Sequence, residues 1–389
     1  MRNPEQTIIA KQVRGMLAVC ALCILTMPGR SASPSPRYAG RVVPAPSNML
    51  FPRSGHTATL LPGGLVLIVG GMHHNGEFYS SAEQYDPRLG SFSPLGGMAF
   101  RRVSPTATLL PNGKVLIAGG SSHPYEEVPV AELYDPSTRA FTATGHMVVP
   151  RGGATAALLP NGKVLIAGGE QGTDETKLAS AELYDPATGT FTLTGSMHVP
   201  RVAHALTILK NGKVLVTGGL SAGRYSTANE VVEATAELYD PATGRFQPTG
   251  SMTTPRCKHA SELLADGRVL VVGGAAANGG WRSQYSTAEI YDPQKGTFAP
   301  AGNMEFERFK LTRALVLLKN GNVLVAGGAE RPEVYDPVTG VFHPVAGAVG
   351  NARYFSTATL LQDGTVLIAG GYGTNPGEGS VPQAWLYRP

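Results

Sequence analysis

The feature that most constrains this sequence is a repeat. The segment LLPNGKVLIAGG occupies residues 109–120 and recurs unchanged at residues 158–169. The glycine pair that closes it occurs seven times, at spacings of 43 to 55 residues. A period of this length is typical of an array of supersecondary units, because each unit buries its apolar face against the next one. The seven pairs are Gly70-Gly71, Gly119-Gly120, Gly168-Gly169, Gly218-Gly219, Gly273-Gly274, Gly327-Gly328 and Gly370-Gly371.

Each repeat unit contains the same four segments. Two apolar segments flank an Asn-Gly or Asp-Gly pair, such as Asn112-Gly113, and an Ala-Glu-Leu-Tyr-Asp-Pro segment follows after a variable loop. A turn such as Asp-Pro-Ala-Thr-Gly at residues 185–189 leads to a fourth segment, which contains Phe and ends near Met and Arg. The Asn-Gly pairs predict type I′ hairpins, in which both central residues have positive φ. Seven four-stranded antiparallel units predict an all-β fold, a seven-bladed β-propeller.

The last unit lacks its fourth segment. Its third segment, at about residues 383–387, is followed by Pro389. A matching segment is found near the N-terminus, where residues 40–53 (GRVVPAPSNMLFPR) align with residues 244–256 (GRFQPTGSMTTPR). We therefore expect the N-terminal segment to form the outer strand of the last blade. It would close a propeller that spans residues 34–389 and leaves no room for a second domain.

The first 33 residues have the pattern of a secretory signal peptide. Lys11 and Arg14 precede an apolar run at residues 16–27, and Ser31-Ala32-Ser33 follows as a cleavage site. The apolar run is too short to span a bilayer. We therefore expect a secreted or periplasmic protein with no transmembrane span. Lipid attachment at Cys20 is a weaker alternative, because a bulky residue directly precedes this cysteine.

Charge and cysteine content exclude several classes of protein. The net charge is +4, and the predicted signal contributes +3 of it, so the remainder offers no basic patch for nucleic acid. Once the signal is removed, Cys257 is the single cysteine, which excludes an internal disulfide and a cysteine metal cluster. We expect the mature protein to be a monomer without a cofactor.

The repeat resembles a known family. Gly-Gly after an apolar strand, then Tyr-Asp-Pro, an aromatic residue and Met-x-x-Pro-Arg, resembles the Kelch repeat, specifically the Kelch propeller of the galactose-oxidase type. The resemblance covers nearly all of residues 40–389. It implies the propeller fold, whereas it leaves function open, because propellers host many unrelated activities.

The same resemblance argues against copper chemistry. It implies a Tyr-His-Ser sequence at the start of an inner strand, where this chain has Tyr354-Phe355-Ser356, and phenylalanine cannot ligate copper. The family's cross-linked Cys and Tyr also lack a counterpart, since Cys257 is followed by Lys258 and His259. A further copper ligand of the family comes from an extra C-terminal domain, which we do not expect here.

The antiparallel order of the strands sorts the loops onto two faces. The hairpin turns lie on one face and hardly vary, whereas the loops after Gly-Gly and the crossings between blades lie on the other, which we call the variable face. Long loops follow the fourth and fifth glycine pairs, whereas the sixth is short. We expect ligand binding there. The candidate ligand-binding residues are Arg224, Tyr225, Trp281, Arg282, Tyr285, Arg308, Arg353 and Tyr354.

Each candidate type has a structural alternative. Trp281 could stack on a ligand, and the structural alternative is that it packs against its own blade. An arginine recurs once per blade at the crossing, and a glutamate recurs in the third strand of six units, so we favour a structural Arg–Glu pair, with a few arginines left for ligand. His56, His204 and His259 each follow the repeat arginine by three residues, and we favour packing over metal binding.

We thus expect an exported module that binds a glycan or protein partner. The alternative is a carbohydrate-active enzyme without a metal, similar to Kelch proteins that equilibrate sialic-acid anomers, with a loop carboxylate of raised pKa as acid or base. A third possibility is a structural surface element with no dedicated ligand. The carboxylates available to the enzyme are Glu126, Glu127, Glu170, Asp174 and Glu175.

Overall fold

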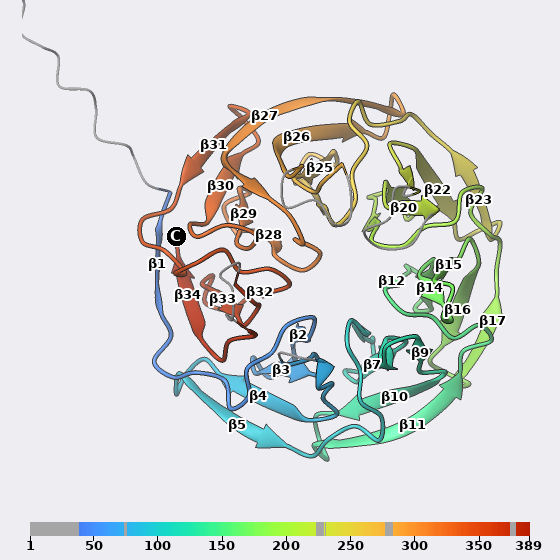
Figure 1. The fold of residues 1–389 in the computed structure, drawn as a ribbon, viewed down its shortest axis with the longest axis horizontal. Helices are drawn as coiled ribbons and strands as arrows, with labels where there is room; N and C mark the ends of the chain where they lie inside the picture. The colour runs from blue at the N-terminus through green and yellow to red at the C-terminus, as the bar shows by residue number, and fades with distance from the viewer. Residues whose placement is uncertain (1–38, 74–75, 223–228, 230, 277–282, 374–378) are drawn as a thin grey trace, which may run out of the picture. The chain divides into compact units, whose positions relative to one another are not determined.

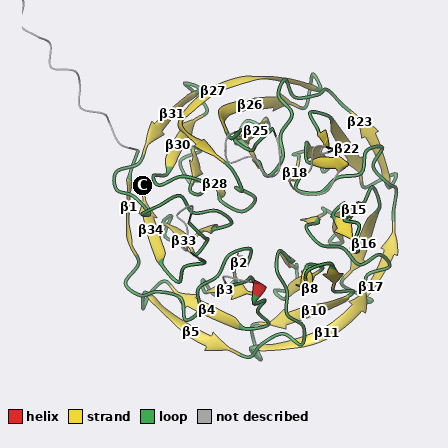
Figure 2. Cartoon of the chain, viewed as in Figure 1, coloured by secondary structure: helices red, strands yellow, loops and turns green. Residues whose placement is uncertain are grey.

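The computed structural model describes residues 39–73, 76–222, 229, 231–276, 283–373 and 379–389. Residues 37–389 form one compact unit, to which all that follows refers. Its regular elements are almost entirely strands, and none of the described residues lies in an α-helix (Figure 2). Seven four-stranded sheets stand radially around a common axis, as blades of a propeller (Figure 1). The all-β, seven-bladed prediction is confirmed.

Six blades are continuous in sequence, and each is a four-stranded antiparallel meander. From the inner to the outer strand they are β2 (Thr57–Leu60), β3 (Val66–Val69), β4 (Ala82–Asp86), β5 (Ser91–Leu95); β6 (Thr106–Leu109), β7 (Val115–Ala118), β10 (Val130–Asp135), β11 (Ala140–His146); β12 (Thr155–Leu158), β13 (Val164–Ala167), β16 (Ala181–Asp185), β17 (Thr190–Leu193); β18 (Ala205–Ile208), β19 (Val214–Thr217), β22 (Ala236–Asp240), β23 (Arg245–Pro248); β24 (Ala260–Leu263), β25 (Val269–Val272), β26 (Tyr285–Asp292), β27 (Thr297–Arg308); and β28 (Leu315–Leu317), β29 (Val323–Val325), β30 (Glu333–Asp336), β31 (Val341–Pro344).

The seventh blade combines both ends of the described chain. It contains β32 (Thr357–Leu360), β33 (Val366–Ala369) and β34 (Ala384–Arg388), with β1 (Arg41–Pro44) antiparallel to β34 as the outermost strand. The register pairs Arg41 with Arg388 and Pro44 with Trp385. Figure 1 shows this blade as three red strands next to a blue one.

The inner hairpin turn differs from the sequence prediction. In the second blade Gly113 N–H donates to the Leu110 carbonyl (2.9 Å), and Leu110 N–H donates to the Lys114 carbonyl (2.8 Å). Gly113 has a φ of 82°, whereas Asn112 is not among the residues with positive φ. The predicted type I′ turn is therefore wrong. The loop is a three-residue type I turn with a glycine bulge, and the Asn112 side chain stabilises it by accepting the Lys114 N–H at Oδ1 (3.1 Å).

The glycine pairs are required for two reasons. Gly119 and Gly120 have φ values of 64° and 80°, which favour glycine. A Cβ at Gly119 would also lie 2.8 Å from the Arg151 carbonyl oxygen of the next blade, and one at Gly120 would lie 2.7 Å from Val103 O. The pairs therefore allow the backbones of the strand and the crossing to approach closely.

The core lies between blades. The second strand of each blade is buried along its length, and the apolar clusters join side chains of neighbouring sheets. A buried tyrosine of the third strand packs on the phenylalanine of the fourth, for example Tyr184 on Phe191 at 4.9 Å between ring centroids. Because each blade covers the faces of its neighbours, the ring needs all seven units to bury its apolar surface.

Three small hairpins extend from the variable face of blades 2, 3 and 4. The hairpins are β8 (Ser121–His123) with β9 (Glu126–Glu127), β14 (Glu170–Gln171) with β15 (Thr176–Lys177), and β20 (Leu220–Ala222) with β21 (Val231–Val232).

No helix among the described residues has the length and apolar character needed to cross a membrane. The predicted signal peptide lies outside the described residues.

Candidate functional site

The crossing arginines of six blades form buried ion pairs. In blade 3, Arg151 Nη2 lies 2.8 Å from Glu182 Oε1, and both side chains are fully buried. Arg151 also donates to the carbonyl of Gly168, the first glycine of the pair, while Glu182 accepts the backbone N–H of Val148. The network ties the crossing, the glycine pair and the third strand together, as the structural alternative predicted. The pairs are Arg53–Glu83, Arg102–Glu132, Arg151–Glu182, Arg201–Glu237, Arg256–Glu289 and Arg308–Glu333.

Blade 7 holds its crossing arginine differently. Trp385 stands opposite Ile368, at the position that the glutamate occupies in the other blades. Its ring centroid lies 5.6 Å from Arg353 Cζ, and Arg353 Nε donates to the Val349 carbonyl (3.3 Å). The guanidinium is thus covered by an aromatic face, which interacts favourably with a cation.

The three repeat histidines are packing residues. His204 Nε2 lies 2.6 Å from Thr155 Oγ1 of the preceding blade, and His259 makes the same contact with Thr217 at 2.9 Å. His56 contacts Thr357 in this way at 3.0 Å. Burial, followed by the charge of the nearby arginine, lowers the pKa of each histidine to about 3. Each therefore stays neutral at physiological pH and joins two blades.

A ring of strained residues surrounds the axis on the variable face. The second residue after each repeat arginine has a φ between 50° and 63°. The left-handed conformation costs roughly 1–2 kcal/mol for a residue other than glycine. Backbone hydrogen bonds join four of these residues to the equivalent residue of the preceding blade, for example Phe355 N–H to the Lys310 carbonyl (3.1 Å). This axial ring consists of Gly55, Ser104, Gly153, Ala203, Lys258, Lys310 and Phe355.

Two lysines of the axial ring lie among aromatic rings of blades 6 and 7. Lys310 Nζ lies 5.0 Å from the ring centroid of Tyr372, 5.1 Å from Phe309, and 5.6 Å from both Tyr354 and Phe355. Its ammonium also donates to the Tyr372 hydroxyl. We call the following set the lysine–aromatic cluster: Lys258, Phe309, Lys310, Tyr354, Phe355 and Tyr372.

The cluster has an unusual electrostatic character. Lys258 Nζ lies 5.5 Å from the Phe309 ring and 5.8 Å from the Phe355 ring, so the two lysines share aromatic neighbours. Burial, followed by the charge of Lys258, lowers the pKa of Lys310 to about 7. Burial also raises the pKa of Tyr372 above its ordinary value. The cluster therefore combines partly buried π faces with two amines, one of which, Lys310, has a lowered pKa.

The sequence-predicted ligand residues divide into three groups. Arg224, Tyr225, Trp281 and Arg282 lie outside the described residues. Arg308 is fully buried and bonded to Glu333, and Arg353 is 7% exposed under Trp385, so both serve their own blades. Tyr285 and Tyr354 belong to the variable face.

Those two tyrosines differ in exposure. Tyr285 is partly exposed, with its ring 5.1 Å from Arg256 Cζ. Tyr354 is only 3% exposed, and the Gln284 amide donates to its hydroxyl (3.3 Å). Tyr354 is therefore a buried member of the lysine–aromatic cluster, with its ring beside Lys310, whereas Tyr285 is partly accessible to a ligand.

Sequence reasoning overlooked Lys258 and Lys310. Both occupy the same place in the repeat, two residues after the arginine, where other units have Gly, Ser, Ala or Phe. This departure from small residues in two adjacent blades was a visible signal.

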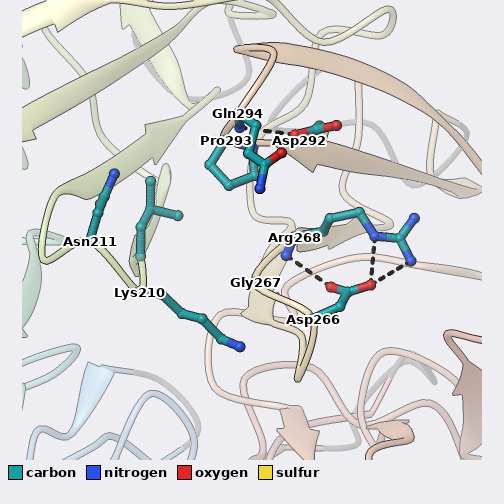
Figure 3. A pocket seen from close by; sticks show the side chains of 9 residues that line it. Lys210, Asn211, Asp266, Gly267, Arg268, Asp292, Pro293 and Gln294 are labelled. Atoms are coloured by element: carbon teal, nitrogen blue, oxygen red, sulfur yellow. Dashed lines mark hydrogen bonds and ion pairs between the residues drawn. The ribbon is translucent and has the colours of Figure 1, made fainter.

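A cavity of about 400 Å³ lies on the opposite face, between the turns of blades 4 and 5 (Figure 3). Figure 3 shows the Asp266 carboxylate turned toward Arg268, at 2.7 Å. Asp292, also in the lining, accepts the backbone N–H of Gln294 (2.9 Å). These contacts stabilise turns, and equivalent turns recur around the ring, so this cavity offers no distinctive chemistry.

The described residues do not fit a copper centre. No three His, Cys, Asp or Glu side chains among them converge so as to hold a metal ion. In the place that the resemblance singled out, Phe355 has no ligating atom and the Tyr354 hydroxyl contacts Gln284. The Cys257 thiol is buried, with Sγ 3.5 Å from the Ala275 carbonyl oxygen.

Seven four-stranded meanders joined by buried crossing arginines define a β-propeller built from one recurring motif. Residues 52–99 match the Kelch motif. The chain is 29% identical over 136 residues to the Kelch repeat-containing protein kel-10 of Caenorhabditis elegans, a match that covers 33% of this chain and 23% of that protein. It is also 29% identical over 141 residues to the Kelch repeat and BTB domain-containing protein F47D12.7 of the same organism, covering 34% and 24%.

A solved structure shows the same fold. A fungal alcohol oxidase of the AA5 family, in complex with copper, has a TM-score of 0.69 and 22% identity, covering 91% of this chain and 76% of that one. The chain thus has a match to the Kelch motif within a seven-bladed β-propeller, which confirms the resemblance predicted from its repeats. The sequence matches span only about a quarter of the length of the two curated relatives.

Proposed function

We propose that this protein is an exported binding module that engages a protein partner through its variable face. The observation that carries the proposal is the lysine–aromatic cluster. Lys258 and Lys310 lie in the axial ring, and the half-buried rings of Phe355 and Tyr372 adjoin them. Aromatic and cationic groups gathered at one place are typical of binding surfaces, because they contribute both apolar area and polar contacts.

The chemistry of the cluster indicates what it would bind. A partner segment with an aromatic or aliphatic side chain can pack on Phe355 and Tyr372, and a carboxylate of the same segment can pair with the lysines. A glycan is the other candidate, since a sugar ring stacks on the same aromatic faces. Protein partners are favoured because the Kelch fold is a common protein-binding scaffold.

Nothing in the loop carboxylates favours the enzyme alternative. Glu126 is largely exposed and lies 2.9 Å from His123 Nδ1. Glu127 accepts the backbone N–H of Gly172 (3.1 Å), and Glu170 and Glu175 both pair with Lys177 at 2.7 and 3.5 Å. These four carboxylates are thus engaged by contacts within the variable loops.

A capture experiment with matched variants tests the binding proposal. The mature protein, the double variant Lys258→Ala/Lys310→Ala and the control Lys295→Ala are immobilised and exposed to an extract of the source organism. Ala203 already holds the same left-handed conformation (φ 55°), so alanine is accommodated at both positions. Lys295 lies in the turn after β26, on the opposite face, with its side chain 75% exposed.

A partner retained by the wild-type protein and by Lys295→Ala, but lost at least tenfold in the double variant, supports the proposal. Release by free monosaccharides identifies a glycan on the partner as the bound group. Equal retention by all three proteins would refute the role of the cluster. Circular dichroism of each variant confirms that the ring is folded.

The export proposal rests on the N-terminal sequence alone. The pattern of Lys11, Arg14, the apolar run of residues 16–27 and the small residues 31–33 supports it. Expression of the full chain followed by intact mass measurement of the exported protein tests it. A new N-terminus near residue 34 is expected, and an uncleaved chain retained in the cytoplasm would contradict it.

A further inference from the structure

Blade 6 departs from the repeat beside the axis. In six units, seven positions separate the crossing arginine from the end of the innermost apolar segment, as between Arg256 and Leu263. In the sixth unit nine positions separate Arg308 from Leu317. Ala314 N–H donates to the Leu311 carbonyl (2.8 Å), so the two additional residues, Thr312 and Arg313, form a turn before β28.

This turn directs Arg313 across the axis. Its Nη1 donates to the His56 carbonyl of blade 1 (3.1 Å), and its Nη2 donates to the Pro105 carbonyl of blade 2. Blades 6 and 2 are separated by blades 7 and 1 around the ring (Figure 1). The two carbonyls therefore fix the guanidinium in one orientation and use two of its five N–H donors.

Two adjoining cavities lie next to this side chain. One of about 200 Å³ is lined by the inner strands of blades 2 to 6, and one of about 90 Å³ reaches the axial ring at Lys258 and Phe355. Arg313 and Thr312 line both of them. Thr155 and Ser261 also line the larger cavity, where their hydroxyls contact His204 Nε2 and Thr207 Oγ1 (both 2.6 Å), and Thr312 adds a further hydroxyl-bearing residue to both linings.

The electrostatics of these cavities favour an anion. Among the residues that the structure describes, their linings include Arg313 and Lys258 and no aspartate or glutamate. Burial lowers the pKa of Arg313 to about 10, so it remains a cation at neutral pH. Within the part of the chain that the structure describes, no carboxylate forms an ion pair with it. A partly buried cation without a counter-ion is costly, and a bound anion would offset that cost.

Glu262 is the acidic residue nearest in sequence to this lining. It follows Ser261 on β24 but lines neither cavity. Burial raises the pKa of its carboxyl to about 7, which leaves it largely protonated in mildly acidic solution and only partly charged at pH 7. It therefore does little to neutralise the cations beside it.

We propose that the axial cavity is a binding site for a small oxyanion, with Arg313 as its principal ligand. The planar guanidinium matches the geometry of carboxylate and phosphate oxygens, and hydroxyl groups nearby supply further hydrogen bonds. The volumes of both cavities, about 200 and 90 Å³, lie below the roughly 300 Å³ at which pockets for drug-sized ligands begin, so the ligand is phosphate or a short carboxylate. This site adjoins the partner surface proposed above, with which it shares Lys258 and Phe355, whereas Arg313 belongs to the cavity alone.

Titration calorimetry with inorganic phosphate and with acetate, at constant ionic strength, tests the site. The wild-type protein is expected to bind at least one of the two saturably, and Arg313→Ala is expected to weaken that binding roughly tenfold or more, the effect of losing hydrogen bonds from a charged group. Arg245→Ala, on the exposed strand β23, removes the same charge away from the axis and is expected to bind as the wild type does.

The outcomes are decisive in both directions. Binding of phosphate alone, or of acetate alone, supports the site and identifies its ligand class. No saturable binding to the wild type overturns the proposal, as does equal binding by Arg313→Ala and Arg245→Ala. If Arg313→Ala does not fold, Arg313→Lys keeps the charge but loses the planar fork, and weaker binding of the anion by several-fold is then the supporting result.

Discussion

The buried Arg–Glu pairs allow a quantitative test, and blade 3 is the most complete example. Glu182 accepts hydrogen bonds from Arg151 Nη2 (2.8 Å), Val148 N–H (2.7 Å) and Val149 N–H (2.9 Å). Substituting Glu182→Gln leaves the fully buried cation of Arg151 without its counter-charge. Breaking one side of such a pair costs about 3–5 kcal/mol, because the remaining charge is already desolvated.

The lower end of this range applies here. Arg151 keeps its hydrogen bonds to the Gly168 and Ser180 carbonyls, and the amide oxygen introduced by the substitution still accepts one N–H bond. We therefore expect Glu182→Gln to lower the free energy of unfolding by about 3 kcal/mol. Burial lowers the pKa of Arg151, and Glu182 opposes this shift, which is consistent with a pair that the fold needs.

Unfolding in guanidinium chloride, followed by tryptophan fluorescence, measures the effect. A double-mutant cycle with Arg151→Met isolates the coupling, expected to be about 2 kcal/mol or more, because neither charge is stranded in the double variant. The control Arg88→Ala breaks an exposed pair with Asp86 (3.5 Å, Arg88 83% exposed) and is expected to cost less than about 0.5 kcal/mol. A cost below about 1 kcal/mol for Glu182→Gln, or no coupling, would refute the reasoning.

Three other substitutions test the contacts between blades. The folded pKa of His204 (about 3) lies below its ordinary value of 6.5, so protonation favours the unfolded chain, and the stability that His204 contributes is full above about pH 6.5 and falls toward pH 3. In acid unfolding curves, His204→Gln should remove roughly 2–3 kcal/mol of the stability loss between pH 7 and 4.5. An unchanged pH profile would count against this reasoning. At Gly219, φ is 98° and a Cβ would lie 2.7 Å from Val202 O, so Gly219→Ala should lower the free energy of unfolding by about 2 kcal/mol or more in denaturant. In the control Gly96→Ala, the added Cβ meets no atom within 4 Å, and the change should be nearly neutral. Similar costs for the two variants would contradict the close approach at Gly219. Trp385→Ala should lower the thermal midpoint, because it removes both apolar burial and the cation–π contact with Arg353. Trp385→Phe keeps an aromatic ring and should lower the midpoint less. Equal losses would indicate that the aromatic face is dispensable.

Much of the fold was predictable because the signals are local and occur in every unit. Gly-Gly, Asn-Gly and Tyr-Asp-Pro each specify a turn or a strand within a few residues, and seven repetitions averaged out the errors of any single assignment. The type I′ prediction failed because the loop has three residues and only its glycine has a positive φ, while the Asn or Asp side chain accepts the N–H two residues further on, as Asn211 Oδ1 does from Lys213 (3.1 Å).

The candidate site was predicted less well, because it depends on contacts between blades that are far apart in sequence. Arg308 and Arg353 were suggested as ligand residues, yet burial under Glu333 and Trp385 engages them within the blades. Lys310 departs visibly from the small residues of other units, but its aromatic surroundings come from two blades and were not predictable from the repeat.

The sequence by itself determined the repeat and the number of blades, and it indicated the Arg–Glu pairing of six units, because each of these depends on residues that recur along the chain. Only the tertiary structure decided where the residues that depart from the repeat come together. Lys258 and Lys310 come together with Tyr372, and Arg313 reaches a carbonyl 208 positions away, at Pro105. The physical reason is the closed ring, which brings the start of every inner strand to one axis regardless of distance along the chain.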